Sequence, residues 1–247
     1  MAEKILIASG KGGVGKSTFS VFLAKNLAGK DKKVLVIDSD TGLGSLDILF
    51  GVPDKVVNSW ADVIADGCDA KQAVLEISTN LYLMPSPRFF EGEIPDDIFK
   101  NITRQLDDEY DVVIIDASAG IDDNLKRCAY ACDRAIFVAT ADEISVRCAA
   151  SAAIEVQKHG ILYDDMRIVI NRYVKKAALK SKLLNIDGVI DKTGISLLGI
   201  LPEDKKVPFM SVTNDTPSSK SVFIGAVDRI ADRMLGKNVP LNFKKFK

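Results

Sequence analysis

The chain has 247 residues, of which 47% are hydrophobic and 27% charged, and its formal net charge is −1. Such a chain can bury a large core, and its length favours one α/β domain over two. The near-zero charge excludes a global attraction to nucleic acid or to an anionic membrane. No apolar run approaches the ~20 residues of a transmembrane helix, and residues 1–8 show no signal-peptide pattern, so we expect a cytoplasmic protein.

A glycine-rich loop follows the first predicted strand. Residues 4–8 form a short apolar run, and residues 17–27 carry the apolar spacing of a helix. The loop between them fits the phosphate-binding pattern G-x-x-x-x-G-K-[ST]. Its members are Gly10, Lys11, Gly12, Gly13, Val14, Gly15, Lys16, Ser17 and Thr18. Strand, loop and helix in this order predict a nucleotide-binding P-loop.

The residue types of this loop suit a nucleoside triphosphate. Glycines allow successive backbone N–H groups to turn toward an anion, and the N-terminus of the following helix adds its dipole. Lys16 can carry a positive charge to the β- and γ-phosphates, and Ser17 can offer its hydroxyl to Mg²⁺. We therefore expect Lys16 and Ser17 to hold the reacting end of the nucleotide.

The second position of the loop indicates which class of P-loop protein this is. It is Lys11, at a place where an ordinary P-loop has no preference. The run from Lys11 to Thr18 resembles the deviant Walker A motif of the MinD/ParA ATPases. In that family the early lysine reaches the phosphates of a partner subunit. The resemblance therefore implies an ATP-bound homodimer in which Lys11 acts in trans, as an arginine finger does. The alternative for Lys11 is a solvated loop lysine.

Two later apolar runs end in carboxylates. Asp38 and Asp40 follow one run, and Asp116 follows the other. The carboxyl ends of parallel strands are the edge at which doubly wound sheets bind ligands. Asp116 fits a Walker B residue, which binds a Mg²⁺ water or accepts a hydrogen bond from Ser17.

The segments after these runs predict the two switches. Residues 36–47 are similar to the first switch of MinD proteins, which here includes Gly42. By that resemblance Asp38 lies near the Mg²⁺ shell and Asp40 orients the attacking water. Gly120 lets the backbone approach the γ-phosphate and sense it. The alternative for both carboxylates is local, with each capping its turn through backbone hydrogen bonds.

The ends of two more predicted strands indicate where the base of the nucleotide binds. Asn171 and Arg172 end an apolar run, and an asparagine amide can pair with N6 and N7 of adenine. In the family this Asn-Arg position lies against the base. Pro202 and Glu203 resemble the base-side loop that follows the last strand. Adenine is favoured over guanine because no Asn-Lys-x-Asp signature is present.

Strand and helix patterns alternate along the chain without repeats or linkers. This alternation predicts an α/β fold with a doubly wound, mostly parallel sheet and helices on both faces. We expect residues 1–247 to form a single P-loop ATPase domain. Further helices are expected over 56–65, 70–77, 95–106 and 144–159, and further strands over 81–85 and 135–140. Trp60 is expected to pack in the core, and His159 to cap the end of its helix.

The four cysteines do not have the spacing of a zinc site or a disulfide framework. Cys128 and Cys132 are four residues apart on a predicted helix and share a face, so they could hold a metal or cluster together with the pair of a partner subunit. That alternative is a cysteine-dependent metallochaperone ATPase. Buried thiols are much commoner, and we expect these two to pack.

The resemblance covers about residues 4–235. It implies a MinD-like, Mg²⁺-dependent ATPase that dimerises on ATP, hydrolyses it slowly until a partner protein stimulates it, and serves as a spatial switch in division-site (septum) placement. The alternatives are a ParA-type DNA partition ATPase, which the net charge does not favour, and a regulator of flagellar placement.

Three departures from the MinD pattern leave the activating partner open. Ala141-Asp142 replaces the usual Pro-Glu, Cys148 replaces an aspartate used in partner contact, and Gly44-Ser45 replaces an Arg-Asn pair.

Residues 238–247 form a short basic and aromatic tail, at the place where MinD proteins continue into a membrane helix. Burying Leu241, Phe243 and Phe246 yields at most about 5–8 kcal/mol, and three lysines add about 1 kcal/mol each. Ordering some seven residues costs roughly 1–2 kcal/mol apiece. We therefore expect no stable membrane binding by one chain, and at most weak ATP-dependent association by the two tails of a dimer on the inner face of the membrane. The alternative is that both phenylalanines pack on the body.

Overall fold

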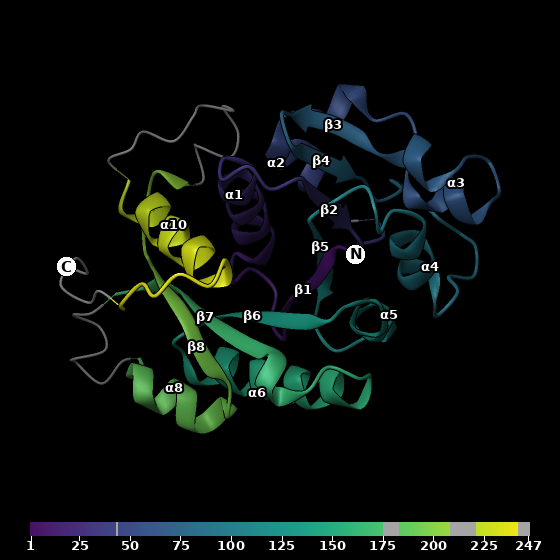
Figure 1. The fold of residues 1–247 in the computed structure, drawn as a ribbon. Coiled ribbons are helices and arrows are strands. Elements are labelled where there is room, and N and C mark those ends of the chain that lie inside the picture. The colour runs from purple at the N-terminus through teal and green to yellow at the C-terminus, as the bar shows by residue number, and fades with distance from the viewer. Residues whose placement is uncertain (43, 175–182, 208–220, 242–247) are drawn as a thin grey trace.

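In this computed structural model the described residues are 1–42, 44–174, 183–207 and 221–241. They contain an eight-stranded sheet in the order β3-β4-β2-β5-β1-β6-β7-β8 (Figure 1). The strands are β1 (Glu3–Ser9), β2 (Val34–Asp38), β3 (Leu75–Ser78), β4 (Leu81–Met84), β5 (Val112–Ala119), β6 (Arg134–Thr140), β7 (Met166–Tyr173) and β8 (Ser196–Pro202). Neighbouring strands run parallel except β3 and β4, which form an antiparallel pair at one edge.

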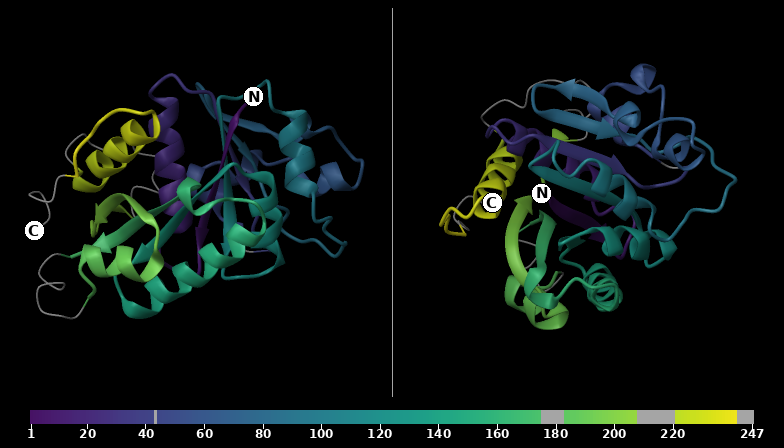
Figure 2. Two further views of the ribbon diagram at one scale, coloured as in Figure 1. Left: turned by 60° about the horizontal axis from the view of Figure 1, so that its bottom comes forward. Right: turned by 45° about the vertical axis from the view of Figure 1, so that its right-hand side comes forward.

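Helices cover both faces of this sheet. Within the described ranges the α-helices are α1 (Lys16–Ala28), α2 (Leu46–Phe50), α3 (Trp60–Ile64), α4 (Ile98–Gln105), α5 (Asp123–Ala131), α6 (Glu143–Lys158), α8 (Ile186–Thr193) and α10 (Val222–Met234). The described residues also form three short 3₁₀ turns, η1 (Pro53–Lys55), η2 (Ala70–Ala73) and η3 (Tyr163–Asp165). Helices α1, α2 and α10 pack on one face, and α4, α5, α6 and α8 pack on the other (Figure 2). This arrangement confirms the predicted doubly wound fold.

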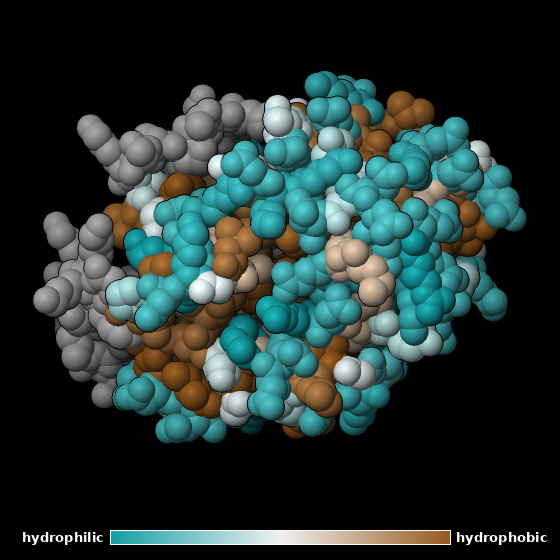
Figure 3. Space-filling model, in the orientation of Figure 1, coloured by the Kyte–Doolittle hydropathy of each residue, from teal (hydrophilic) through white to brown (hydrophobic). Residues whose placement is uncertain are grey.

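The alternation of side chains along the strands builds two cores. In β1, Ile5 and Ile7 face the core beneath α1 and α10, whereas Leu6 and Ala8 face the core beneath α4, α5 and α6. Both sides of the central strands are buried, as expected of parallel strands covered by helices. Hydrophilic residues cover most of the face seen in Figure 3. None of the described helices is long and apolar enough to cross a bilayer.

The predicted elements differ from the observed ones mainly at the β3 edge. The helix expected over residues 70–77 is wrong, because the short turn η2 ends at Ala73 and Leu75–Ser78 form the edge strand β3. The helix expected over 56–65 shortens to α3, and Trp60 is fully buried there. His159 caps α6 as expected, with its Nδ1 3.0 Å from the carbonyl oxygen of Glu155.

Two further differences concern strand ends and the tail. Strand β5 continues to Ala119, so Asp116 lies within the strand and not at its end. Residues 242–247, which include Phe243 and Phe246 of the tail, lie outside the described residues.

Candidate nucleotide site

The P-loop connects β1 to α1 at the carboxyl edge of the sheet. Gly13 and Gly15 adopt φ values of +75° and +93°, a left-handed backbone that glycine adopts without strain. A Cβ atom placed on Gly13 would meet no atom within 4 Å, so the space beside this exposed glycine is open. The loop therefore has the left-handed turns that allow successive backbone N–H groups to face an anion.

Lys16 opens α1 and extends into the site. Its Nζ lies 2.9 Å from Asp116 Oδ2 and 3.2 Å from the hydroxyl of Ser17. The Lys16 and Asp116 side chains are only 8% and 2% exposed. The second carboxylate oxygen, Asp116 Oδ1, accepts a 2.6 Å hydrogen bond from Ser20. Three predicted residues, Lys16, Ser17 and Asp116, are thus brought together, and a bound phosphate would compete with Asp116 for the ammonium.

Asp38 lies opposite Asp116 in the pairing of β2 with β5. Burial, and next the neighbouring charge of Asp116, raise the pKa of Asp38 to about 7. Oδ1 of Asp38 accepts the backbone N–H of Asp40, and Oδ2 accepts those of Ser45 and Leu46. The local capping role of Asp38 is therefore present in the structure.

Asp40 begins the first switch segment and is half-buried. Burial is the main cause that raises the pKa of this carboxyl. The positive charge of Lys16 opposes the shift, and the negative charges of Asp116 and Asp122 add to it. Its carboxylate is thus within electrostatic reach of the P-loop lysine.

These carboxylates fit a divalent cation. Asp38 and Asp116 are two buried acids held close together, and a hard dication prefers such oxygen ligands. Ser17 adds a hydroxyl beside them. Ser17, Asp38 and Asp116 are therefore the residues that would hold Mg²⁺.

Both switch glycines have a left-handed backbone. Gly120 has φ +118°, and its N–H donates a 3.0 Å hydrogen bond to the carbonyl of Ser9 at the root of the P-loop. Gly42 has φ +86°, and a Cβ atom there would meet nothing within 4 Å. The second switch is therefore attached to the strand that carries the P-loop, while the first has open space at Gly42.

Lys11 does not project freely from the loop. Its Nζ lies 3.3 Å from Oδ1 of Asp142, the residue that caps the N-terminus of α6. The two side chains are 42% and 34% exposed. In this structure Lys11 is therefore partly exposed and has an acidic neighbour in its own chain.

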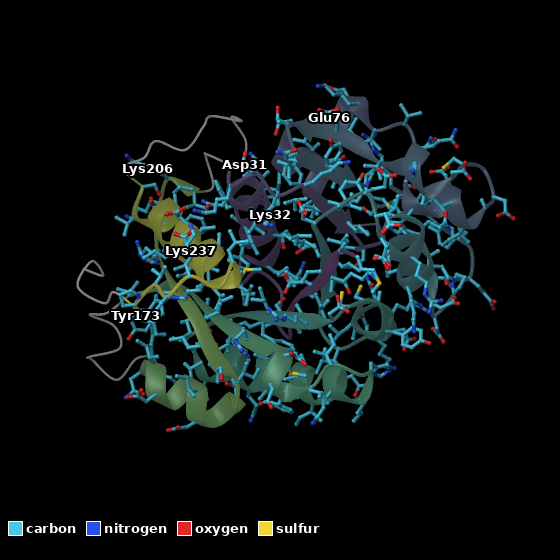
Figure 4. All side chains as sticks on the ribbon, viewed as in Figure 1. Asp31, Lys32, Glu76, Tyr173, Lys206 and Lys237 are labelled. Atoms are coloured by element: carbon cyan, nitrogen blue, oxygen red, sulfur yellow. The ribbon has the colours of Figure 1, made fainter. Side chains whose placement is uncertain are left out.

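The predicted base-side residues lie on adjacent strands. Asn171 and Arg172 are at the end of β7, Pro202 ends β8, and Glu203 follows it. Asn171 is 5% exposed, whereas Arg172 and Glu203 are exposed. Tyr173, which pairs with Pro202 across these strands, lies far from Glu76 of the edge strand β3 in Figure 4. The base-side residues are therefore gathered at the β7–β8 end of the sheet.

Three residues of the site were missed from the sequence. Ser20 holds Asp116, and its position four residues after Lys16 could have shown that both share a helix face. Trp60 Nε1 donates a 2.9 Å hydrogen bond to the Asp38 carbonyl, and Asn124 Nδ2 donates one of 2.7 Å to the Ser39 carbonyl. No local signal connects these residues to the first switch.

The cysteine pair lies behind the first switch. Cys128 is fully buried, and its thiol lies 3.2 Å from the hydroxyl of Ser39. Burial raises the pKa of this thiol to about 12, which disfavours the thiolate that a metal requires. Cys132 follows the end of α5 and packs against the same core. Cys128 is therefore packed in the core as expected, while Cys132 is partly buried against it.

Comparison with known proteins assigns the family. A family model described as the CobQ/CobB/MinD/ParA nucleotide binding domain matches residues 5–217. The septum site-determining protein MinD of Bacillus subtilis (strain 168) is 34% identical over 251 residues, covering 98% of this chain and 92% of that protein. The chain belongs to the MinD/ParA family of nucleotide-binding ATPases.

Solved structures of this family share the fold. MinD in a MinC:MinD cell division complex from Aquifex aeolicus is 25% identical with a TM-score of 0.88, covering 98% of each chain. MinD from Pyrococcus horikoshii OT3, complexed with Mg-ADP, is 22% identical with a TM-score of 0.84, covering 97% of this chain and 100% of that one. A putative plasmid partition protein from Borrelia burgdorferi B31, bound to AMPPNP, is 26% identical with a TM-score of 0.79, covering 96% of this chain and 99% of that one.

Proposed function

We propose that this protein is a Mg²⁺-dependent ATPase that dimerises on ATP and works as a spatial switch. The observation that carries the proposal is the buried cluster at the carboxyl edge, where the P-loop ammonium of Lys16 pairs with Asp116 and Asp38 lies opposite Asp116 on the neighbouring strand. Such a cluster combines a phosphate-binding charge with ligands for the metal that accompanies a triphosphate. Family membership supports the same assignment.

The residues have separate roles in this proposal. Lys16 binds the β- and γ-phosphates, and the backbone N–H groups from Gly12 to Gly15 surround them. Ser17, Asp38 and Asp116 would hold Mg²⁺, and the bound ion would neutralise charge on the phosphates. Asp40 orients the attacking water. Catalysis by such a site consists mainly of positioning and charge stabilisation.

Lys11 supplies the second catalytic charge from a partner subunit. It stands in the P-loop with 42% of its side chain exposed, and the Asp142 side chain with which it pairs is 34% exposed. Such pairs contribute little free energy, so this one does not prevent Lys11 from reaching a partner's phosphate. Two exposed apolar residues favour an interface at this edge. Ile121 follows Gly120 of the second switch, and Ile144 lies in the first turn of α6.

The adenine base lies against the β7–β8 end of the sheet in this proposal. Asn171, Arg172, Pro202 and Glu203 provide an amide, a guanidinium and backbone groups at that end. The ends of β7 and β8 are adjacent, so one planar base can contact both strands.

The cellular role that we propose is division-site placement. Relatives named MinD extend over almost the whole chain, and one MinD forms a complex with MinC, a precedent for an additional protein partner. The similarity to a plasmid partition protein supports partition on DNA as the second candidate. The two functions differ in the surface on which the ATP-bound protein collects.

One set of measurements tests the enzyme and separates the two roles. The wild type and the Asp40→Ala variant are assayed for Mg²⁺-dependent ATP hydrolysis and then for ATP-dependent sedimentation with anionic liposomes and with plasmid DNA. We expect slow hydrolysis that is lost in Asp40→Ala, and weak recruitment of the ATP-bound form to liposomes. ATP-dependent retention on DNA without liposome binding would favour partition, and absent hydrolysis would contradict the ATPase assignment.

Truncation tests the tail. A chain that ends at Asn238 should lose the ATP-dependent liposome association, whereas the nucleotide-free full chain should show none. Tight liposome binding by the nucleotide-free chain would contradict the free-energy argument for the tail.

A further inference from the structure

A buried amide connects the end of β7 to the back of the P-loop. Asn171 is 5% exposed, and its Nδ2 donates a 2.7 Å hydrogen bond to the carbonyl oxygen of Val14. Its Oδ1 accepts a 2.9 Å hydrogen bond from the backbone N–H of Arg172. Because these two bonds use a donor and an acceptor of the same amide, they fix its orientation.

The hydrogen bond is made at the left-handed turn of the P-loop. Val14 lies between Gly13 and Gly15, whose left-handed φ values reverse the chain. A Cβ atom on Gly15 would come within 2.4 Å of Asn171 Nδ2, so the amide packs directly against the loop. A buried carbonyl without a donor is costly, and Val14 is itself only 3% exposed. The Val14 carbonyl therefore depends on Asn171 for its position.

The same amide keeps enough hydrogen-bonding capacity for a base. A primary amide has two N–H donors and two oxygen lone pairs, and the bonds to Val14 and Arg172 use one of each. One donor and one lone pair are left. Adenine presents one acceptor, N7, and one donor, N6–H, which an asparagine amide can engage together.

We propose that Asn171 is a positioning residue that couples the base site to the P-loop, an inference that rests on the proposed function. One N–H of Asn171 holds the Val14 carbonyl and fixes the turn that presents backbone amides to the phosphates. The remaining donor and lone pair serve the base. Loss of the amide therefore weakens the binding of phosphates even when no base is attached to them.

The test uses a ligand without a base. Binding of Mg·ATP and of inorganic tripolyphosphate with Mg²⁺ is measured by calorimetry for the wild type, Asn171→Ala and Asn171→Asp. Asn171→Asp keeps the shape of the side chain and the acceptor for Arg172 but places an oxygen against the Val14 carbonyl. We expect both variants to bind tripolyphosphate at least fivefold more weakly, with Asn171→Asp the weaker, and to lose at least as much affinity for Mg·ATP.

Matched controls separate positioning from stability. Asn185→Ala removes another asparagine amide that bonds backbone, at the start of α8, and should leave both affinities unchanged. Hydrogen exchange at the amides of residues 13–16 should become faster in Asn171→Ala than in Asn185→Ala, at temperatures well below unfolding. Loss of a base contact alone would not change the exchange rate of these loop amides, so faster exchange supports the positioning role.

The outcomes are distinguishable. Unchanged tripolyphosphate affinity in both Asn171 variants, with a loss confined to Mg·ATP, would overturn the positioning role and leave Asn171 as a base contact only. A wild type that binds neither ligand would instead overturn the proposed function itself.

Discussion

Lys11 Nζ lies 3.3 Å from Asp142 Oδ1, an ion pair that joins the P-loop to the first residue before α6 within one chain. If Lys11 acts in trans, this pair must break when the ATP-bound dimer forms. Both side chains are more than one-third exposed, so the pair is worth at most about 1 kcal/mol. Asp142 also accepts hydrogen bonds from the Ser145 N–H and the Thr140 hydroxyl, which a neutral amide can partly retain.

Asp142→Asn therefore tests whether the pair restrains dimerisation. Asparagine is a good N-cap, so α6 should remain intact while the competing charge is lost. We expect the protein concentration at half-maximal ATP-dependent dimerisation to fall by two- to fivefold, measured by analytical ultracentrifugation. A higher concentration requirement than in the wild type would show that Asp142 supports the dimer instead.

Lys16→Ala should remove nucleotide binding. The buried ammonium has no substitute near the phosphates, so we expect Mg·ATP to bind at least tenfold more weakly by calorimetry. Breaking its buried pair with Asp116 should also lower the free energy of unfolding by about 3–5 kcal/mol. Lys32→Ala, on the loop after α1, is the matched control and should bind ATP normally. Normal ATP affinity in Lys16→Ala would exclude the P-loop assignment.

Asp38 makes the nucleotide-free protein sensitive to pH. Its pKa is raised from 3.8 to about 7 in the folded state, so the folded state binds more protons than the unfolded state between these values. The contribution of Asp38 to the free energy of unfolding is fully present below pH 3.8 and is lost as the pH rises through 7. At 1.36 kcal/mol per pKa unit the loss is at most about 4 kcal/mol.

Urea unfolding of the wild type and Asp38→Asn between pH 4.5 and 8 measures this effect. The neutral variant loses capping contacts at every pH. The comparison is therefore between the slopes of unfolding free energy against pH, and not between the free energies themselves. We expect the wild type to lose up to about 3 kcal/mol more than the variant over this range. Parallel curves would mean that Asp38 does not titrate here.

Trp60→Phe tests the anchor of the first switch. Phenylalanine keeps the aromatic packing against Phe99 but cannot donate to the buried Asp38 carbonyl. An unsatisfied buried carbonyl costs about 1–3 kcal/mol of unfolding free energy, which circular dichroism in urea can measure. ATP hydrolysis should fall more than ATP affinity, because the hydrogen bond positions the strand end that carries Asp38 and Asp40. Equal stability of variant and wild type would contradict the anchoring role.

Local patterns predicted the central sheet well because its strands are continuous apolar runs. Ile5 to Ala8 and Val112 to Ile115 are buried on both faces, and no other element type suits such short apolar runs between turn residues. The P-loop could also be predicted from the sequence, because its glycines and lysine have a fixed spacing.

Long-range contacts explain what the sequence did not reveal. Leu75–Ser78 form a strand because β4 pairs with them, although the segment carries the spacing of a helix. Lys11 and Asp142 are 131 residues apart, and Asn124 and Ser39 are 85 apart, so no local pattern joins them. These contacts exist because strand order brings the ends of β1, β2, β5 and β6 to one edge.

Light scattering of the purified chain with and without Mg·ATP tests the dimerising switch most directly. We predict that the wild type is a monomer of 26.8 kDa without nucleotide and a dimer with saturating ATP. Lys11→Ala should bind ATP but stay monomeric, and Asp40→Ala should form a dimer that persists because water is no longer oriented for hydrolysis. A wild type that binds ATP and remains monomeric at saturating nucleotide would contradict the mechanism.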